Sequence, residues 1–457
     1  MFDISILLGI VLLAISGYWA GTYKANIVAQ GDVRQLHSRQ PYYGYMVALW
    51  ISLPAVIIML LWLTFEADIV THLLVSKLPN ELLNKDHSLL INEIKNLAST
   101  NLNESIQSPA LINAARHYQE LTWTSYASFL ATFFFIAIVG GLAALKKITP
   151  TLRARNQVED IIRYLLILCS IIAIFTTVGI IFSVLFEAIR FFEKIPFFDF
   201  VFGLEWSPQM AIREDQVGSS GAFGMIPVFA GTMMITIIAM MIAVPIGLYS
   251  AIYLSEYAPK KFRSIAKPLL EVLAGVPTVV YGFFAALVVA PMIRDSGSLI
   301  GLSVSSESAL AAGLVMGIMI IPFVSSLSDD VINAVPQSLR DGAYALGSTQ
   351  AETVRKVVLP AALPGIVGGV LLAVSRAIGE TMIVVMAAGL SANLTANPLE
   401  AVTTVTVQIV TLLVGDQEFD SAKTLAAFAL ALMLFVVTLF LNVIALHIVR
   451  KYREQYE

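Results

Sequence analysis

The sequence predicts an all-α polytopic membrane protein. Hydrophobic residues make up 58% of the 457 residues and charged residues only 13%, whereas soluble domains are about half apolar and a quarter charged. The mean hydropathy is +0.81, and the apolar residues gather in blocks that suit the roughly 20 helical residues needed to cross about 30 Å of hydrocarbon. The apolar blocks indicate membrane lipid as the surroundings. A net charge of −4, with basic residues confined to short segments, argues against a nucleic-acid partner.

Nine apolar stretches are candidates for membrane-spanning helices. The first is expected to be a retained span and not a signal peptide, because Asp3 stands where a basic residue is usual and no small-residue cleavage site ends the stretch. The expected spans are 2–20, 43–65, 123–145, 164–186, 226–254, 269–292, 309–326, 363–388 and 424–447.

Lysine and arginine in the short connecting segments predict the orientation, because such residues stay on the cytoplasmic side. With nine spans, the basic clusters fall on one side of the membrane, which places the N-terminus outside and the C-terminus in the cytoplasm. Segment 66–122 then lies outside, and it holds seven acidic residues against four basic ones. The basic clusters are Lys24, Arg34 and Arg39; Lys146, Lys147, Arg153, Arg155 and Arg163; Lys260, Lys261, Arg263 and Lys267; and Arg450, Lys451 and Arg453.

The outer segment 66–122 is expected to form a small helical hairpin. Apolar residues in its middle have the spacing of one helix face, and a polar break follows at 101–109. The residues expected on that face are Leu89, Leu90, Ile94 and Leu97.

The cysteine and histidine content predicts neither a metal site nor another cofactor. Cys169 is the only cysteine, so the chain has no partner for an internal disulfide and no cysteine cluster. The five histidines are scattered without metal-binding spacing, and the spans carry no paired carboxylates and no nucleophile beside a base. We therefore expect a protein that is not an enzyme and has no catalytic residues.

Segment 328–362 is too polar to be a span, and it reads as two short helices joined by a glycine turn. Pro336 suits the first turn of the first helix, and Gly347 stands where a helix end needs a left-handed residue. Thr349 and Glu352 form a capping box for the second helix, which Pro360 is expected to end. Leu339, Ala343 and Leu346 make an apolar stripe on the first helix.

The same segment resembles the E-A-A-x3-G-x9-I-x-L-P motif of binding-protein-dependent ABC permeases, with Asp, Gly and Val replacing the first Glu, the first Ala and the Ile. The resemblance implies a cytoplasmic coupling helix that docks in a groove of an ATPase subunit. The alternative is an amphipathic helix on the membrane surface. The chain has no phosphate-binding loop of its own, so ATP hydrolysis is expected on a partner. The motif residues are Asp341, Gly342, Ala343, Gly347, Val357, Leu359 and Pro360.

Further stretches resemble the phosphate-importer permeases of the PstC type, in family order from about residue 164 to 450. This resemblance implies a type I ABC permease core of six helices at 161–457, with its coupling loop at 328–362. The three spans of 1–160, with the external loop 66–122, form an extension that the short form of that family does not explain. The stretches are 202–208, 223–227, 231–232, 251–256, 275–282 and 376–381.

Span eight carries charged residues deep in an apolar stretch. Arg376 lies 13 residues past Leu363, about 20 Å along a helix, where a charge costs roughly 2.5 kcal/mol or more and is expected to face the bundle interior or a cavity. Its planar fork of donors suits a phosphate oxyanion, and Glu380, one turn further on, is its expected partner. We assign Arg376, Glu380 and Thr381 to the substrate pathway. The alternative is that the charged pair only ties helices together.

Two prolines are expected inside spans. Pro245 falls in span five and Pro277 in span six, where neighbouring helices can compensate for the lost backbone hydrogen bond. Both are read as kinks and not as substrate contacts.

Taken together, the residues and the resemblance predict the transmembrane permease subunit of an ATP-driven importer for inorganic phosphate, working by alternating access in the bacterial inner membrane. The resemblance implies a second related permease, cytoplasmic ATPase subunits and a periplasmic phosphate-binding protein as partners. Two alternatives stay open: a permease for another oxyanion such as sulfate or molybdate, and a membrane signalling or scaffold protein whose segment 328–362 binds a regulator.

Overall fold

The computed structural model describes residues 4–78, 87–99, 109–210, 220–414 and 420–453. These residues include nine helices that are long and apolar enough to cross a membrane, one for each expected span. The all-α polytopic fold is therefore confirmed. The chain divides into two compact units, Met1–Phe175 and Thr176–Glu457, and each is described by itself. The boundary predicted after residue 160 falls within the long helix α5 (Ala154–Lys194) and stays a prediction.

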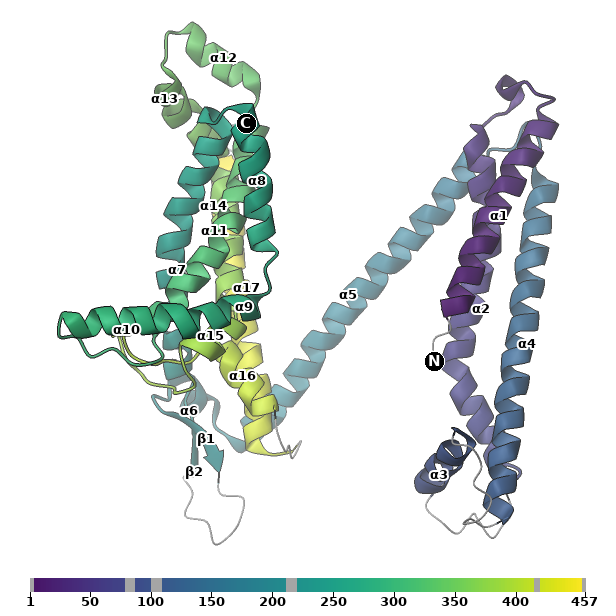
Figure 1. Cartoon of the computed structure of the whole chain (residues 1–457), viewed down its shortest axis with the longest axis horizontal. Helices are drawn as coiled ribbons and strands as arrows, with labels where there is room; N and C mark the ends of the chain where they lie inside the picture. The colour runs from purple at the N-terminus through teal and green to yellow at the C-terminus, as the bar shows by residue number, and fades with distance from the viewer. Residues whose placement is uncertain (1–3, 79–86, 100–108, 211–219, 415–419, 454–457) are drawn as a thin grey trace. The chain divides into compact units, whose positions relative to one another are not determined.

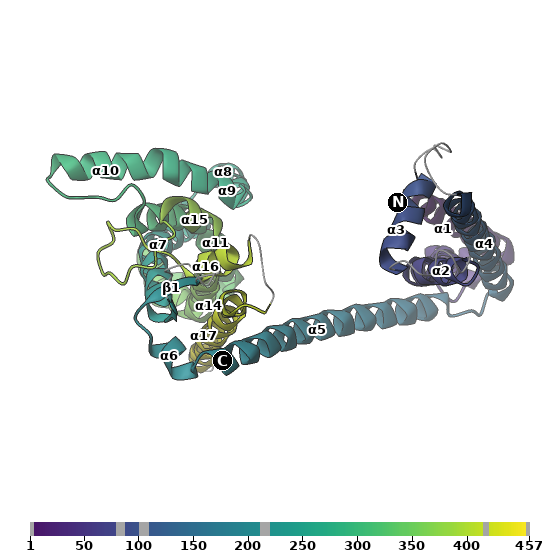
Figure 2. The ribbon, with the colours of Figure 1, turned by 90° about the horizontal axis from the view of Figure 1, so that it is seen from below.

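Three long helices form the first unit: α1 (Ile4–Val28), α2 (Gln40–Val75) and α4 (Pro109–Lys147). They lie side by side (Figures 1 and 2). Their common core holds fully buried Tyr43, Phe133 and Ala137 among other apolar side chains. The Tyr43 hydroxyl donates to the Leu152 carbonyl at 3.1 Å, so the polar end of this buried ring is satisfied by the connection between α4 and α5.

The outer segment contains one helix, α3 (His87–Ser99), which packs on the ends of α2 and α4. Leu90 and Ile94 are buried against that cluster, and Leu97 is partly buried there. Leu89 is 67% exposed, so its expected place on the packed face is wrong. The helical part of the predicted hairpin is present, while the polar break expected at 101–108 lies outside the described residues.

A helical bundle forms the second unit, in which α7, α11, α14 and α17 run side by side (Figure 1). Its centre is an apolar cluster that includes Ala239, Val315, Met316, Ile320 and Ala373. The bounds of the four helices are Ile226–Ile252, Ala309–Ala334, Leu359–Ile378 and Ala422–Arg453.

Shorter elements complete the second unit. A hairpin that the sequence patterns did not predict, β1 (Trp206–Met210) with β2 (Ser220–Phe223), pairs Trp206 with Phe223. The Trp206 indole Nε1 donates to Gln408 Oε1 at 2.8 Å, which fastens the hairpin to α16 (Val405–Leu413). The remaining helices are α6 (Phe197–Phe202), α8 (Lys260–Ala274), α9 (Thr278–Phe284), α10 (Ala290–Leu299), α12 (Gln337–Ala345), α13 (Gln350–Thr353) and α15 (Met382–Ala387).

Span six differs from its predicted bounds because the helix is interrupted before Pro277. The helix α8 ends at Ala274, and Pro277 is the N-cap of α9, so this proline lies at a helix boundary and not inside a helix. A proline has no N–H to donate and disfavours helical geometry in the residue before it. The span is Thr278–Leu299, and the expected segment 269–274 belongs to α8. Pro245 lies inside α7, as expected.

Pro360 does not end the second helix of segment 328–362. A π-helical turn at Val354–Val358 follows α13 and continues directly into α14, with Pro360 in the first turn. In the wider turn the Leu359 N–H donates to the Val354 carbonyl, so the backbone passes the proline without losing its helical path. The preceding helix α11 also extends to Ala334, so the connection between α11 and α14 begins after residue 334 and not at 328.

Candidate functional site

The connection between α11 and α14 has the two-helix form that the sequence predicts. Gly347 has φ of +83° and ends α12 in a left-handed turn. The capping box is present: the Glu352 N–H donates to Thr349 Oγ1 at 3.3 Å, and the Thr349 N–H donates to Glu352 Oε2 at 3.1 Å. Pro336 is the residue before α12 and not part of its first turn. Figure 1 shows α12 and α13 together beyond one end of the bundle.

The three residues of the predicted apolar stripe on α12 do not share one environment. Ala343 is buried against the rest of the unit, whereas Leu339 is 45% and Leu346 89% exposed. Asp341 and Gly342 are exposed beside them. Apolar side chains at the tip of a polar connection are therefore left uncovered by the described part of this unit, as a docking surface for another protein would be.

The other three motif residues lie apart from this tip: Val357 is in the π-helical turn, and Leu359 and Pro360 are in the first turn of α14. Leu359 packs against a buried cluster that includes Ala251, Ile332 and Val358. Its position indicates a role in holding the base of the connection.

A buried arginine, which no sequence motif singled out, holds α12 against the bundle. Arg340 is 8% exposed, and its Nη2 lies 2.9 Å from Oε1 of Glu256, in the π-helical turn Tyr253–Tyr257 that continues α7. The guanidinium also donates to the carbonyls of Val335 at 2.6 Å and Ile332 at 2.8 Å. The sequence shows that Arg340 is a charged residue next to the motif, but it does not show its partner, because Glu256 lies 84 residues earlier in the chain.

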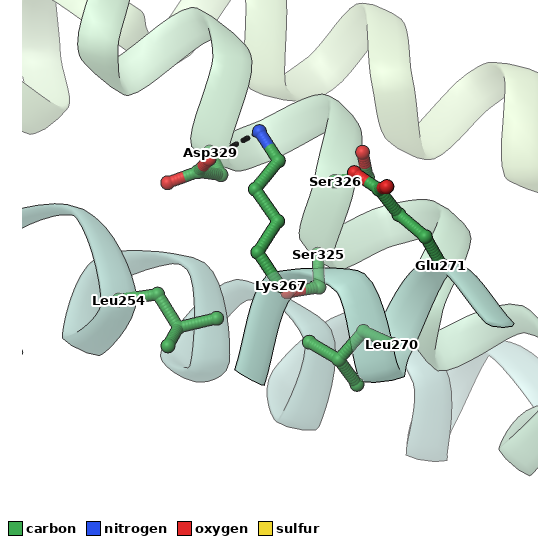
Figure 3. A pocket seen from close by; sticks show the side chains of 7 residues that line it. All are labelled: Leu254, Lys267, Leu270, Glu271, Ser325, Ser326 and Asp329. Atoms are coloured by element: carbon green, nitrogen blue, oxygen red, sulfur yellow. Dashed lines mark hydrogen bonds and ion pairs between the residues drawn. The ribbon is translucent and has the colours of Figure 1, made fainter. Parts of the chain in front are cut away.

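A second charged cluster joins α8 to α11 next to this tether (Figure 3). The Asp329 carboxylate is 2% exposed and accepts from Arg263 Nη2, which is 3.0 Å from both oxygens, and from Lys267 Nζ at 2.9 Å. Lys267 also contacts Asp330 at 3.0 Å. The hydrogen bond to Asp329, and then that to Asp330, raises the pKa of Lys267, so this ammonium stays charged at neutral pH.

Arg376 and Glu380 do not form the predicted pair. The helix α14 ends at Ile378 and Gly379 follows as its cap, so the i, i+4 geometry does not continue to Glu380. Glu380 is instead buried, and its Oε1 accepts from the N–H groups of Met382 at 3.1 Å and Ile383 at 3.4 Å, at the start of α15. Thr381 lies between α14 and α15. The Glu380 carboxylate therefore accepts hydrogen bonds from backbone N–H groups of α15 and does not pair with Arg376.

Arg376 lies on the surface of the second unit, so it does not face the interior of this chain's own bundle, and its expected place in a cavity stays a prediction. Its Cζ atom is 5.8 Å from the centre of the Phe323 ring. Within the described ranges, no hydrogen bond or ion pair engages its guanidinium donors. The fork of donors therefore stays free to bind an acceptor from outside this chain.

Comparison with known proteins connects this arrangement to a family. Residues 7–176 match the family described as "Phosphate ATP-binding cassette transporter", and residues 243–454 match "Binding-protein-dependent transport system inner membrane component". The probable ABC transporter permease protein YqgH of Bacillus subtilis is 31% identical over 289 residues, which cover 63% of this chain and 89% of that relative.

Two further relatives are named PstC. The phosphate transport system permease protein PstC 1 of Mycobacterium tuberculosis is 33% identical over 272 residues, covering 54% of this chain and 80% of that protein. The PstC protein of Haemophilus influenzae is 37% identical over 153 residues, covering 30% of this chain and only 49% of that protein. The chain therefore belongs to the PstC-type family of phosphate ABC transporter permeases. It is a permease subunit of the inner membrane and not an enzyme.

Two solved ABC transporters also match part of the chain. A bacterial alginate importer has a TM-score of 0.46 with 16% identity, covering 65% of this chain and 97% of its own. The methionine transporter MetNI has a TM-score of 0.38 with 17% identity, covering 50% of this PstC-type chain and 94% of its own.

The Asp329 cluster of this PstC-type permease yields a stability prediction. Asp329→Asn leaves Arg263 and Lys267 without their shared charge, and removal of one partner from a buried charged group costs up to about 3–5 kcal/mol, less where the cations are partly exposed as here. We expect a clearly lower melting midpoint for the purified chain in detergent. The control, Asp330→Asn, changes a carboxylate whose side chain is 63% exposed and should shift the midpoint far less. Equal shifts would contradict a special role for Asp329.

Proposed function

We propose that this chain is the transmembrane subunit of an ATP-driven importer for inorganic phosphate that works by alternating access. The observation that carries the proposal is Arg376, a guanidinium with free donors in an apolar span of a chain whose relatives are phosphate permeases. The proposed partners are a second related permease, two cytoplasmic ATPase subunits and a periplasmic phosphate-binding protein. The relatives' names and the description of the matched permease family support them.

The proposed ATPase contact is the tip of α12. Leu339, Tyr344 and Leu346 are exposed there, which suits a helix that inserts apolar side chains into a groove. Arg340 links the base of this tip to Glu256 and to the end of α11, while Asp329 joins α11 to α8 through Arg263 and Lys267. A displacement of α12 by the ATPase would therefore be passed to the bundle through ion pairs and not through a flexible connection.

The proposed anion path runs along the surface that carries Arg376. Because this arginine lies on the outside of the bundle of this chain, a second permease is needed to enclose it and to exclude lipid from the anion. A planar guanidinium can hold a phosphate oxyanion with two parallel hydrogen bonds. Glu380 and Thr381 would contribute indirectly, since Glu380 fixes the start of α15 directly after the break.

The proposed orientation has the N-terminus and α3 outside, with α12 and the C-terminus in the cytoplasm, as the lysine and arginine distribution favours. Leu89→Cys in α3 and Ser338→Cys in α12, each in a Cys169→Ala background, should react with an impermeant thiol reagent from opposite sides of sealed membranes. Both positions are exposed, which makes their reactivity comparable. Reaction of both from the same side would refute the proposed orientation.

A glycine pair tests the contact with the ATPase. Gly347→Ala places a Cβ at φ of +83°, a conformation that costs an L-residue roughly 1 kcal/mol or more, so we expect weaker co-purification with the ATPase and less transport-coupled ATP hydrolysis. The control is Gly342→Ala, which has open space around it, lies inside α12 and brings the motif closer to the family pattern. Equal loss in both variants, or no loss in either, would count against the glycine turn as the feature that sets docking.

Arg376→Lys tests the anion path, because it keeps the charge and removes the planar fork. We expect uptake of labelled phosphate by the reconstituted complex to fall by at least about tenfold, as loss of a charge-assisted hydrogen bond of about 1.5–3 kcal/mol implies, while the complex still assembles. Arg294→Lys, an exposed arginine of α10 beside Asp295, is the matched control and should transport normally. Sulfate and molybdate serve as competitors, and near-normal uptake by Arg376→Lys would remove this residue from the path.

A further inference from the structure

The helices α11 and α14 approach closely because glycines of α14 face branched side chains of α11. A Cβ on Gly365 would lie 2.4 Å from Val331 Cγ1, and a Cβ on Gly369 would lie 3.2 Å from Leu327 Cβ. These two contacts are one helical turn apart on both helices, since each step is four residues. One more turn in the same antiparallel direction reaches Phe323 on α11. On α14 the same step reaches Ala373, close to Arg376.

Phe323 is the residue that meets the arginine at this next turn. Its ring centre is 5.8 Å from the Arg376 Cζ atom, within the range at which the negative face of an aromatic ring attracts a guanidinium. The neighbouring polar groups are already engaged, because Ser375 Oγ donates to Asn442 Oδ1 at 3.2 Å and Glu380 caps α15. Among the described residues, the Phe323 ring is therefore the group that contacts the Arg376 guanidinium.

We propose that Phe323 is a positioning residue that holds Arg376 in the orientation needed to bind the transported anion. This inference rests on the proposed role of Arg376 in the phosphate path. A carboxylate in the place of Phe323 would also hold the arginine, but it would occupy the donors that an oxyanion must use and would repel the anion. An aromatic ring attracts the cation through its face and accepts none of the in-plane hydrogen bonds, so it orients the guanidinium and leaves its fork free.

The proposal predicts a change in apparent affinity and not in the capacity to turn over. Without the ring, the long arginine side chain adopts more conformations and binds the anion less often in the right geometry. The loss of a cation–π contact of this kind corresponds to roughly a three- to tenfold change in an equilibrium constant. The effect should therefore appear as a higher KM for phosphate, with kcat and complex assembly nearly unchanged.

The experiment measures phosphate uptake by the reconstituted complex, with KM and kcat determined separately. Phe323→Leu and Phe323→Met remove the ring, whereas Phe323→Tyr and Phe323→Trp keep an aromatic face. We expect KM to rise about three- to tenfold in the first pair and to stay within about twofold of the unmodified value in the second pair. Phe435→Leu on α17, another partly exposed phenylalanine, is the control for simple loss of a ring and should leave KM unchanged.

Two results would overturn the proposal: an unchanged KM in the aliphatic variants, or a KM raised equally in the aromatic variants. The aromatic pair still tests the proposal if an aliphatic variant fails to assemble. Combining Phe323→Leu with Arg376→Lys separates this inference from the proposed function. If the two residues act together, the double variant transports no worse than Arg376→Lys alone. Normal uptake by Arg376→Lys refutes the anion path itself, whereas poor uptake there with a normal Phe323→Leu refutes only the role of Phe323.

Discussion

The architecture depends on one constraint, which is that backbone polar groups in an apolar surrounding must find their partners within the protein. Two irregular points in the bundle show how this is met. The π-turn at Val354–Val358 carries the chain past Pro360 with a hydrogen bond from the Leu359 N–H. At the next break, the Glu380 carboxylate accepts from two N–H groups at the start of α15. The helices can therefore be interrupted inside the bundle without leaving these donors unsatisfied.

The same constraint explains why the charged residues collect at the end of the bundle that carries α12. Asp329 and Arg340 are almost fully buried, yet each has several partners, so neither charge is left without compensation. Asp329 joins α8 to α11, and Arg340 joins the short helix α12 to the end of α11 and to the turn that follows α7. Because α12 itself has little buried surface, these polar contacts, and not an apolar core, determine where its exposed apolar tip is presented.

Much of this fold could be predicted from the sequence, because its signals are local. The nine spans follow from apolar length, and the turn at Gly347 and the capping box of Thr349 and Glu352 follow from residues next to one another. The contacts that organise the site are not local. Arg340 meets Glu256 across 84 residues, and Arg263 meets Asp329 across 66. No spacing rule within one segment could have paired them.

Among the local predictions that failed, the pairing of Arg376 with Glu380 is the most informative. That pairing assumed an unbroken helix, but α14 ends at Ile378. The break therefore gives Glu380 to the backbone of α15 and leaves Arg376 without a counter-charge among the described residues. An unpaired cation in a span costs free energy, and on the proposed anion path the transported oxyanion would offset this cost. A helix that continued past Glu380 would place the two charges at i and i+4, where they could neutralise each other, so the early break is what leaves the arginine donors available for the proposed path.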